Sequence, residues 1–98
     1  MQLEFESDVF LWEARTTSWF FGTVPPELSE QIRELAQFPG GFGSLKVHVQ
    51  IGRTSWSTSI FPDSSRGAYV LPLKKAVRDA EGITAESVIT VRLEVLGI

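Results

Sequence analysis

The stretch LKVHVQI at residues 45–51 places an apolar side chain at every second position, and ITVRLEV at residues 89–95 repeats this pattern 44 residues later. An alternation with period two is typical of a β-strand that buries one face. A proline and a short segment with helical spacing precede each stretch, and their apolar residues also correspond, Leu28 with Leu73 and Ile32 with Val77. The chain therefore contains two copies of one unit of strand, short helix and strand.

Two copies are too few for a solenoid, which needs about three repeats to bury its faces. Closure into one barrel uses the alternating faces of both copies and leaves no long hydrophobic strand edge exposed. We therefore predict a mainly β fold with two short helices, a small closed or pseudo-barrel of about six strands with an internal two-fold pseudo-repeat. The helices are expected to plug its ends.

The other expected elements follow from local signals. The expected strands share alternating or bulky apolar side chains and cover residues 3–9, 19–24, 45–51, 56–61, 68–71 and 89–95. The expected helices share helical spacing behind a proline and cover about residues 26–37 and the segment from Pro72 to Gly82, where glycine favours a left-handed cap. A loop is expected at residues 38–43, and Gly52-Arg53 fits a two-residue hairpin turn.

Length and composition limit the class of protein. The 98 residues leave room for one domain, residues 1–98, and the apolar and charged fractions of 43% and 21% are those of a globular chain. The chain has no cysteine, so it has neither a disulfide framework nor a thiolate site. The first residues form a charged strand pattern rather than a signal peptide, and no apolar run approaches the length of a membrane span. We expect a cytoplasmic protein without a membrane association.

Charge is unevenly distributed along the sequence. The net charge is -3, but the six basic residues of the segment 45–78 are opposed there only by Asp63. An acidic protein gains little general attraction to a phosphate backbone, which disfavours nucleic acid as a partner. The basic segment remains compatible with a local anion site.

A family resemblance adds to these patterns. The run from Tyr69 to Arg78, followed by Gly82-Ile83 and the last strand, resembles a half-barrel of the AbrB and MazE swapped-hairpin proteins. WSTSIFP at residues 56–62, then Gly67-Ala68-Tyr69 and LPLKK at residues 71–75, is more similar to the bacterial family named domain of unknown function nineteen-oh-five. That resemblance implies a small closed or pseudo-barrel with two helices and no assigned chemistry. The AbrB-like resemblance implies DNA binding as an alternative function.

One group of residues has the chemistry of an anion pocket. The hydroxyl run of residues 55–59 stands near several cations, and the residues expected to bind a ligand are Arg53, Trp56, Thr58, Ser59, Lys74 and Arg78. Hydroxyls and a guanidinium bind carboxylate or phosphate because several short donors converge on the anion. The alternative is that the hydroxyls face water or bond across strands, while Lys74, Lys75 and Arg78 form the polar side of a helix. Period two leaves open whether Trp56, Thr58 and Ile60 or Ser57, Ser59 and Phe61 point inward.

Other candidate chemistry is weaker. His48 is the only histidine and lies on the polar face of a strand, so we expect it to be exposed rather than a general base. Ser57 and Ser59 lack the G-x-S-x-G context of a serine nucleophile. Same-face strand carboxylates such as Glu4, Glu6 and Asp8 lie about 7 Å apart and diverge, so we expect no metal site and no cofactor.

The aromatic residues have two interpretations. Trp12, Trp19, Phe20 and Phe21 could stack on sugar rings or bases, but a small barrel needs large side chains to fill it, so we expect them in the core. An exposed aromatic residue at Trp12 or Phe42 could instead mark a dimer face, and the chain is expected to be a monomer or homodimer.

Three functions remain after these steps. The first is a non-enzymatic binding module for a small anionic ligand or an acidic partner segment. The second is a DNA-binding protein, and the third is an enzyme, which a lone histidine and the absence of cysteine make the least favoured.

Overall fold

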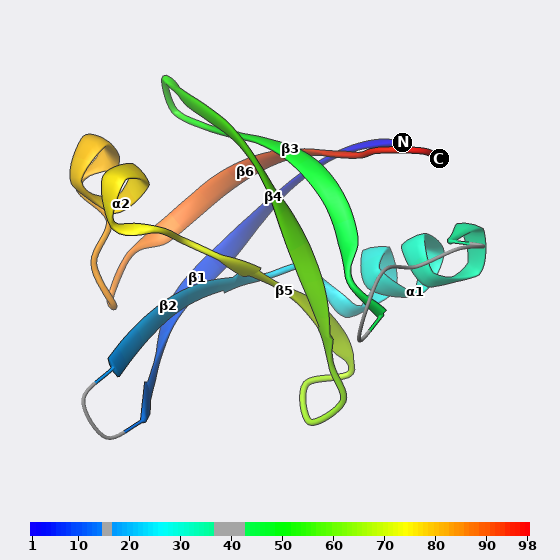
Figure 1. The fold of residues 1–98 in the computed structure, drawn as a ribbon, viewed down its shortest axis with the longest axis horizontal. Coiled ribbons are helices and arrows are strands. Elements are labelled where there is room, and N and C mark those ends of the chain that lie inside the picture. Colours follow the sequence, from blue (N-terminus) through cyan, green and yellow to red (C-terminus); the bar gives the residue numbers. More distant parts are fainter. Residues whose placement is uncertain (15–16, 37–42) are drawn as a thin grey trace.

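The computed structural model describes residues 1–14, 17–36 and 43–98. Its elements in chain order are β1 (Gln2–Ala14), β2 (Thr17–Thr23), α1 (Pro26–Leu35), β3 (Leu45–Ile51), β4 (Thr54–Asp63), β5 (Ala68–Pro72), α2 (Lys75–Glu81) and β6 (Val88–Val95). The six strands close into an antiparallel barrel in the order β1-β2-β5-β4-β3-β6, with the two helices on opposite sides of it (Figure 1). The predicted small closed barrel with two helices is confirmed. Residues 37–42, which include most of the predicted loop, the expected end of the first helix and Phe42, lie outside the described residues.

Two long strands each belong to both walls of the barrel. Residues 2–8 of β1 pair with β6, and the rest of β1 pairs with β2. In the same way, residues 54–60 of β4 pair with β3, and the last three residues of β4 pair with β5. The barrel therefore consists of a β3–β6 wall and a β2–β5 wall that share β1 and β4.

The strand registers obey the two-fold relation predicted from the repeat. Val49 of β3 lies opposite Leu93 of β6, 44 residues later, and Thr23 of β2 lies opposite Val70 of β5, 47 residues later. A shift of 53 residues relates β1 to β4, and the shift of 47 residues relates β2 to β5. Together they convert the pair Val9↔Gly22 into Pro62↔Tyr69, and both pairs occur. Likewise Leu3↔Leu93 becomes Trp56↔Val49. The approximate axis therefore passes between β3 and β6 and between β2 and β5.

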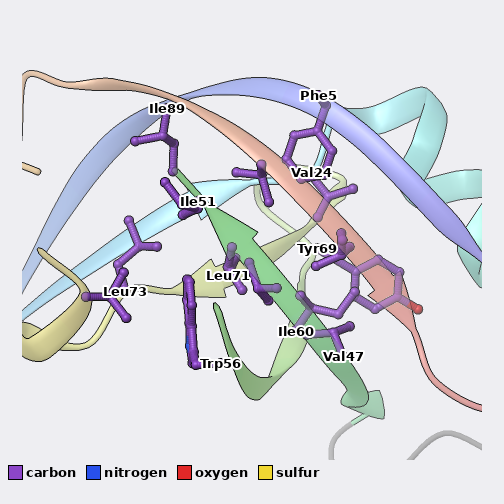
Figure 2. Close-up of a cluster of buried hydrophobic side chains, with 14 of the residues drawn as sticks. Phe5, Val24, Val47, Ile51, Trp56, Ile60, Tyr69, Leu71, Leu73 and Ile89 are labelled. Atoms are coloured by element: carbon purple, nitrogen blue, oxygen red, sulfur yellow. The ribbon is translucent and has the colours of Figure 1, made fainter. Parts of the chain in front are cut away.

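The interior is filled by one apolar cluster with members from both helices and every strand except β2, which packs Phe20 against it. Ile32 of α1 and Val77 of α2, which correspond in the repeat, are both fully buried. In β4 the inward residues are Trp56, Thr58 and Ile60, which resolves the question that period two left open. Figure 2 draws Trp56 and Ile60 among the buried side chains of this cluster.

The start of the second helix differs from the prediction. Pro72 is the last residue of β5, opposite Phe21, and α2 begins only at Lys75. The Leu73 N–H donates to the Phe20 carbonyl at 2.8 Å, so the pairing with β2 continues past Pro72 and delays the helix. The end agrees with the prediction, because Gly82 has a left-handed φ of 63° and the Ile83 N–H donates back to the Arg78 carbonyl.

Two buried serines complete the first half of the barrel. The Ser29 hydroxyl donates to the Val24 carbonyl at 2.9 Å and accepts the Tyr69 N–H at 3.0 Å, which ties α1 to β5. The Ser7 hydroxyl accepts the Thr23 N–H at 2.8 Å, just beyond the point where the β1–β2 pairing ends. Both hydroxyls therefore satisfy backbone groups that no strand partner reaches.

The hairpin of β1 and β2 is longer than predicted and carries the main error of the sequence analysis. Trp12 and Trp19 keep 53% and 49% of their surface exposed, so the prediction that they fill the core is wrong for both. Both lie on the outer face of the hairpin, whose strands extend past the predicted limits at residues 9 and 19 to Ala14 and Thr17. Phe20, by contrast, packs against the core, whereas Phe21, also expected there, lies opposite Phe10 on the outer face.

Candidate functional site

The expected ligand-binding residues of β4 lie on different faces of the barrel wall. Trp56 is buried in the core with 8% of its surface exposed, and Thr58 also points inward. Ser59 lies on the outer face with Ser57. A ligand on the outer face therefore reaches the two serine hydroxyls without touching the Trp56 ring.

The expected basic residues lie at separate places. Arg53 is exposed in the two-residue turn between β3 and β4, and Lys74 is exposed just before α2. Arg78 is half-buried, with its Nε donating to the Leu73 carbonyl at 3.0 Å and its guanidinium 4.0 Å from the centre of the Phe20 ring. These contacts fasten α2 to the strand segment that precedes it and to β2. Arg78 therefore already has a structural role.

The outer face of β3 and β4 does bring a cation and hydroxyls together. Lys46 lies directly opposite Ser59, and the next outward pair is His48 with Ser57. Three of these four residues border a shallow groove of about 330 Å³, which is lined by Lys46, Val47, Ser57, Thr58, Ser59, Phe61 and Leu96. We call this the hydroxyl groove. Of the expected set, Ser59 lines it from the outer face, and Thr58 borders it although its side chain points inward.

Lys46 was counted among the basic residues of the sequence but not placed in the candidate site. The signal that could have found it is the Gly52-Arg53 turn. A two-residue turn makes Ile51 pair with Thr54, and counting outward from that pair sets Lys46 against Ser59. Among the described residues, no carboxylate lies within 4.0 Å of the Lys46 amine, so its charge is available to a ligand.

A polar row beside the groove contains the lone histidine. His48 lies between Glu94 of β6 and Ser57 of β4 in the register, and its Nδ1 is 3.3 Å from the Ser57 hydroxyl. The ring is exposed, as predicted, and within the described part of the chain it forms no ion pair with Glu94. A serine nucleophile needs a base that a carboxylate holds in position, so this row lacks the geometry of a triad.

The adjoining surface of the same wall is held by an ion pair. The Arg92 Nε lies 2.8 Å from a Glu4 carboxylate oxygen, and the two residues are directly opposite in β6 and β1. Both side chains are mostly exposed, so the pair contributes at most about 1 kcal/mol.

Across residues 1–14, 17–36 and 43–98, no three metal-ligating side chains gather into one group.

The turn between β4 and β5 is organised by Asp63. Its carboxylate accepts hydrogen bonds from the Ser65 hydroxyl at 2.6 Å and the Ser65 N–H at 3.0 Å. The bond from the Ser65 hydroxyl is the main reason that the pKa of Asp63 is lowered, with smaller contributions from backbone N–H groups and the Arg66 charge. Arg66 then reaches over β1, where its guanidinium lies 3.5 Å from the centre of the Phe10 ring.

One family model covers most of the chain. The family model described as Domain of unknown function (DUF1905) matches residues 5–93, which include most of both copies of the repeat. The chain belongs to this family. A comparison with curated proteins gave no match. In the described part of the chain, neither helix combines the length and the apolar character that crossing a membrane requires.

Proposed function

We propose that this DUF1905 barrel is a non-enzymatic binding module, and that the hydroxyl groove takes a small anionic ligand. The observation that carries the proposal is the position of Lys46 directly opposite Ser59, with Ser57 lining the same groove. An ammonium and two hydroxyls supply the short donors that a carboxylate or phosphate group accepts.

The walls of the groove suggest the shape of the ligand. Phe61 and Leu96 line it and keep 40% and 46% of their surface exposed. Apolar walls around a few polar groups are typical of small-molecule sites. The ligand of this proposal therefore combines one anionic group with an apolar or aromatic part. The small volume of the groove favours such a molecule over an acidic partner segment.

DNA binding by the basic segment 45–78 has less support. Arg53 lies at one end of β4 and Arg66 follows its other end, while Lys75 is paired with Asp79 at 2.7 Å. Arg66 and Arg78 are stacked on aromatic rings of this chain. A duplex is recognised by a continuous basic stripe, and these side chains do not form one. An enzymatic function has less support still, because among the described residues the His48 ring has a hydrogen bond to Ser57 and none to a carboxylate.

Titration with phenyl phosphate, followed by amide chemical shifts, tests the proposal. We expect the largest shifts at Lys46, Ser57 and Ser59, and a loss of about 10- to 150-fold in affinity for Lys46→Gln, since a hydrogen bond to a charged group contributes about 1.5–3 kcal/mol. Arg53→Gln is the matched control, because it removes the same charge from an exposed site outside the groove. Equal losses in the two variants would indicate general charge attraction, and the absence of shifts in the groove would overturn the proposal.

A further inference from the structure

A second surface is formed by the outer face of the β1–β2 hairpin. Phe10 lies opposite Phe21, and Trp12 lies opposite Trp19, so four aromatic side chains share one face. The Phe10 and Phe21 rings are stacked with their centres 5.4 Å apart, and both tryptophans are about half exposed. We call these four residues the aromatic ribbon. Figure 1 shows the β1–β2 hairpin extending away from the body of the barrel.

The two-fold relation shows that the barrel does not need these rings. The counterpart of the pair Phe10↔Phe21 is Asp63↔Ala68, which occurs in the β4–β5 hairpin. Trp12 and Trp19 correspond to Ser65 and Arg66, which lie in the turn of that hairpin. The β4–β5 hairpin therefore takes its equivalent place in the wall without an aromatic side chain at any of these four positions. The aromatic ribbon is an addition of the first copy.

One ring of the ribbon already holds a cation from the same chain. The Arg66 guanidinium lies 3.5 Å from the centre of the Phe10 ring, at one end of the ribbon. The negative face of an aromatic ring attracts a cation, and arginine adds a planar surface that stacks on the ring. Arg66 covers Phe10 and leaves the two tryptophans at the other end of the ribbon exposed.

The charges beside the ribbon are complementary to a cation. Glu6 and Asp8 precede Phe10 on the same outer face of β1, and with Phe10 and Arg66 they line a groove of about 500 Å³. Glu4 is paired with Arg92, but within the described ranges neither Glu6 nor Asp8 has a cation within 4.0 Å. Arg66 has Asp63 as its own counter-charge at 3.7 Å. The groove therefore has an excess of negative charge.

We infer that the aromatic ribbon docks an arginine-containing peptide segment of a partner protein. One guanidinium stacks on Trp12 and Trp19, as Arg66 does on Phe10, and a neighbouring basic side chain approaches Asp8 and Glu6. This site lies on a different wall from the hydroxyl groove and takes a ligand of opposite charge. The inference therefore stands apart from the proposed anion binding, and either can fail without the other.

The test uses the whole chain and an acetylated, amidated peptide, Gly-Arg-Gly-Arg-Gly, with a citrulline version as the uncharged control. The indole N–H signals of Trp12 and Trp19 are expected to shift on titration, while that of the buried Trp56 stays in place. Trp12→Ala and Trp19→Ala are each expected to weaken binding by about three- to tenfold. Asp8→Asn should weaken it less and should reduce its dependence on salt.

Phe61→Ala is the matched control, because Phe61 is an exposed aromatic residue outside the ribbon. It should leave the affinity for the arginine peptide unchanged. Equal binding of the citrulline peptide, or unmoved Trp12 and Trp19 signals, would overturn the inference. If these signals instead change when the protein alone is diluted, a second copy of the chain occupies the ribbon and the assignment to an arginine segment is wrong.

Discussion

The β1–β2 and β4–β5 hairpins occupy equivalent places in the barrel but have different surfaces. They share a register as far as Phe10↔Phe21 and its counterpart Asp63↔Ala68. Beyond that point the β4–β5 chain turns, closed by Asp63, whereas β1 and β2 continue to pair as far as Ala14 and Thr17. The shared part closes the barrel, and the extension adds exposed aromatic surface. The two copies therefore form equivalent parts of the barrel wall and differ at the tips of their hairpins.

Divergence also reaches the buried positions. Ser7 and Ile60 correspond under the two-fold relation, and both point into the barrel. Ser7 satisfies the Thr23 N–H, whereas Ile60 is fully buried and adds apolar volume to the core. At this position the first copy therefore uses a hydroxyl to satisfy a backbone group, and the second copy uses an apolar side chain to fill the core. Either solution is sufficient because a buried backbone group needs one partner and a buried cavity needs filling.

The largest expected effect concerns the shared wall. Leu93→Ala removes a fully buried side chain beside the two-fold axis and should lower the free energy of unfolding by about 2–5 kcal/mol. Trp12→Ala on the hairpin extension should lower it by less than about 1 kcal/mol, because that ring is half exposed. Urea denaturation of both variants measures the difference. A similar loss for the two would show that the aromatic ribbon belongs to the core after all.

An intermediate effect is expected where the first copy uses a buried hydroxyl. Ser29→Ala leaves the Tyr69 N–H without its partner inside the protein and should cost about 1–3 kcal/mol of stability. Ser57→Ala removes an exposed hydroxyl and should change stability by no more than about 0.5 kcal/mol. Thermal unfolding of the pair measures this contrast, and equal values would mean that the Ser29 hydrogen bonds contribute nothing.

The smallest expected effect concerns the turn of the β4–β5 hairpin. Because the pKa of Asp63 is lowered in the folded state, its ionised carboxylate stabilises the fold above the ordinary value of 3.8. That contribution is lost as the pH falls through the lower folded pKa. The wild-type chain should therefore exceed Asp63→Asn in stability at neutral pH, and the difference should vanish in strong acid.

Ser65→Ala sharpens this last test. It removes the hydroxyl that is the main cause of the lowered pKa, so the pH dependence of stability should shrink while the carboxylate remains. Urea midpoints measured between pH 2 and pH 7 provide the comparison. An Asp63→Asn difference that persists in strong acid would point to packing rather than charge.

Sequence patterns alone predicted much of the wall and little of its surface chemistry. The alternation at residues 45–51 and 89–95, and the turn at Gly52-Arg53, depend on neighbours along the chain, and the structure has both strands and the turn there. The candidate site depended on which residues meet across strands. The predicted site contained Thr58 and Ser59, but it also contained Trp56 and Arg78. In the structure Trp56 is buried in the core, and the Arg78 guanidinium stacks on the Phe20 ring.

Local spacing thus determined the strands, the repeat and the tendency to close. The tertiary structure decided which face of residues 56–61 points inward, because both faces of that strand carry apolar side chains and only the opposite wall selects one. It also decided that Trp12 and Trp19 remain exposed. A tryptophan is buried only where another element covers it, and no local pattern records that the hairpin carrying these two extends past the elements that would do so.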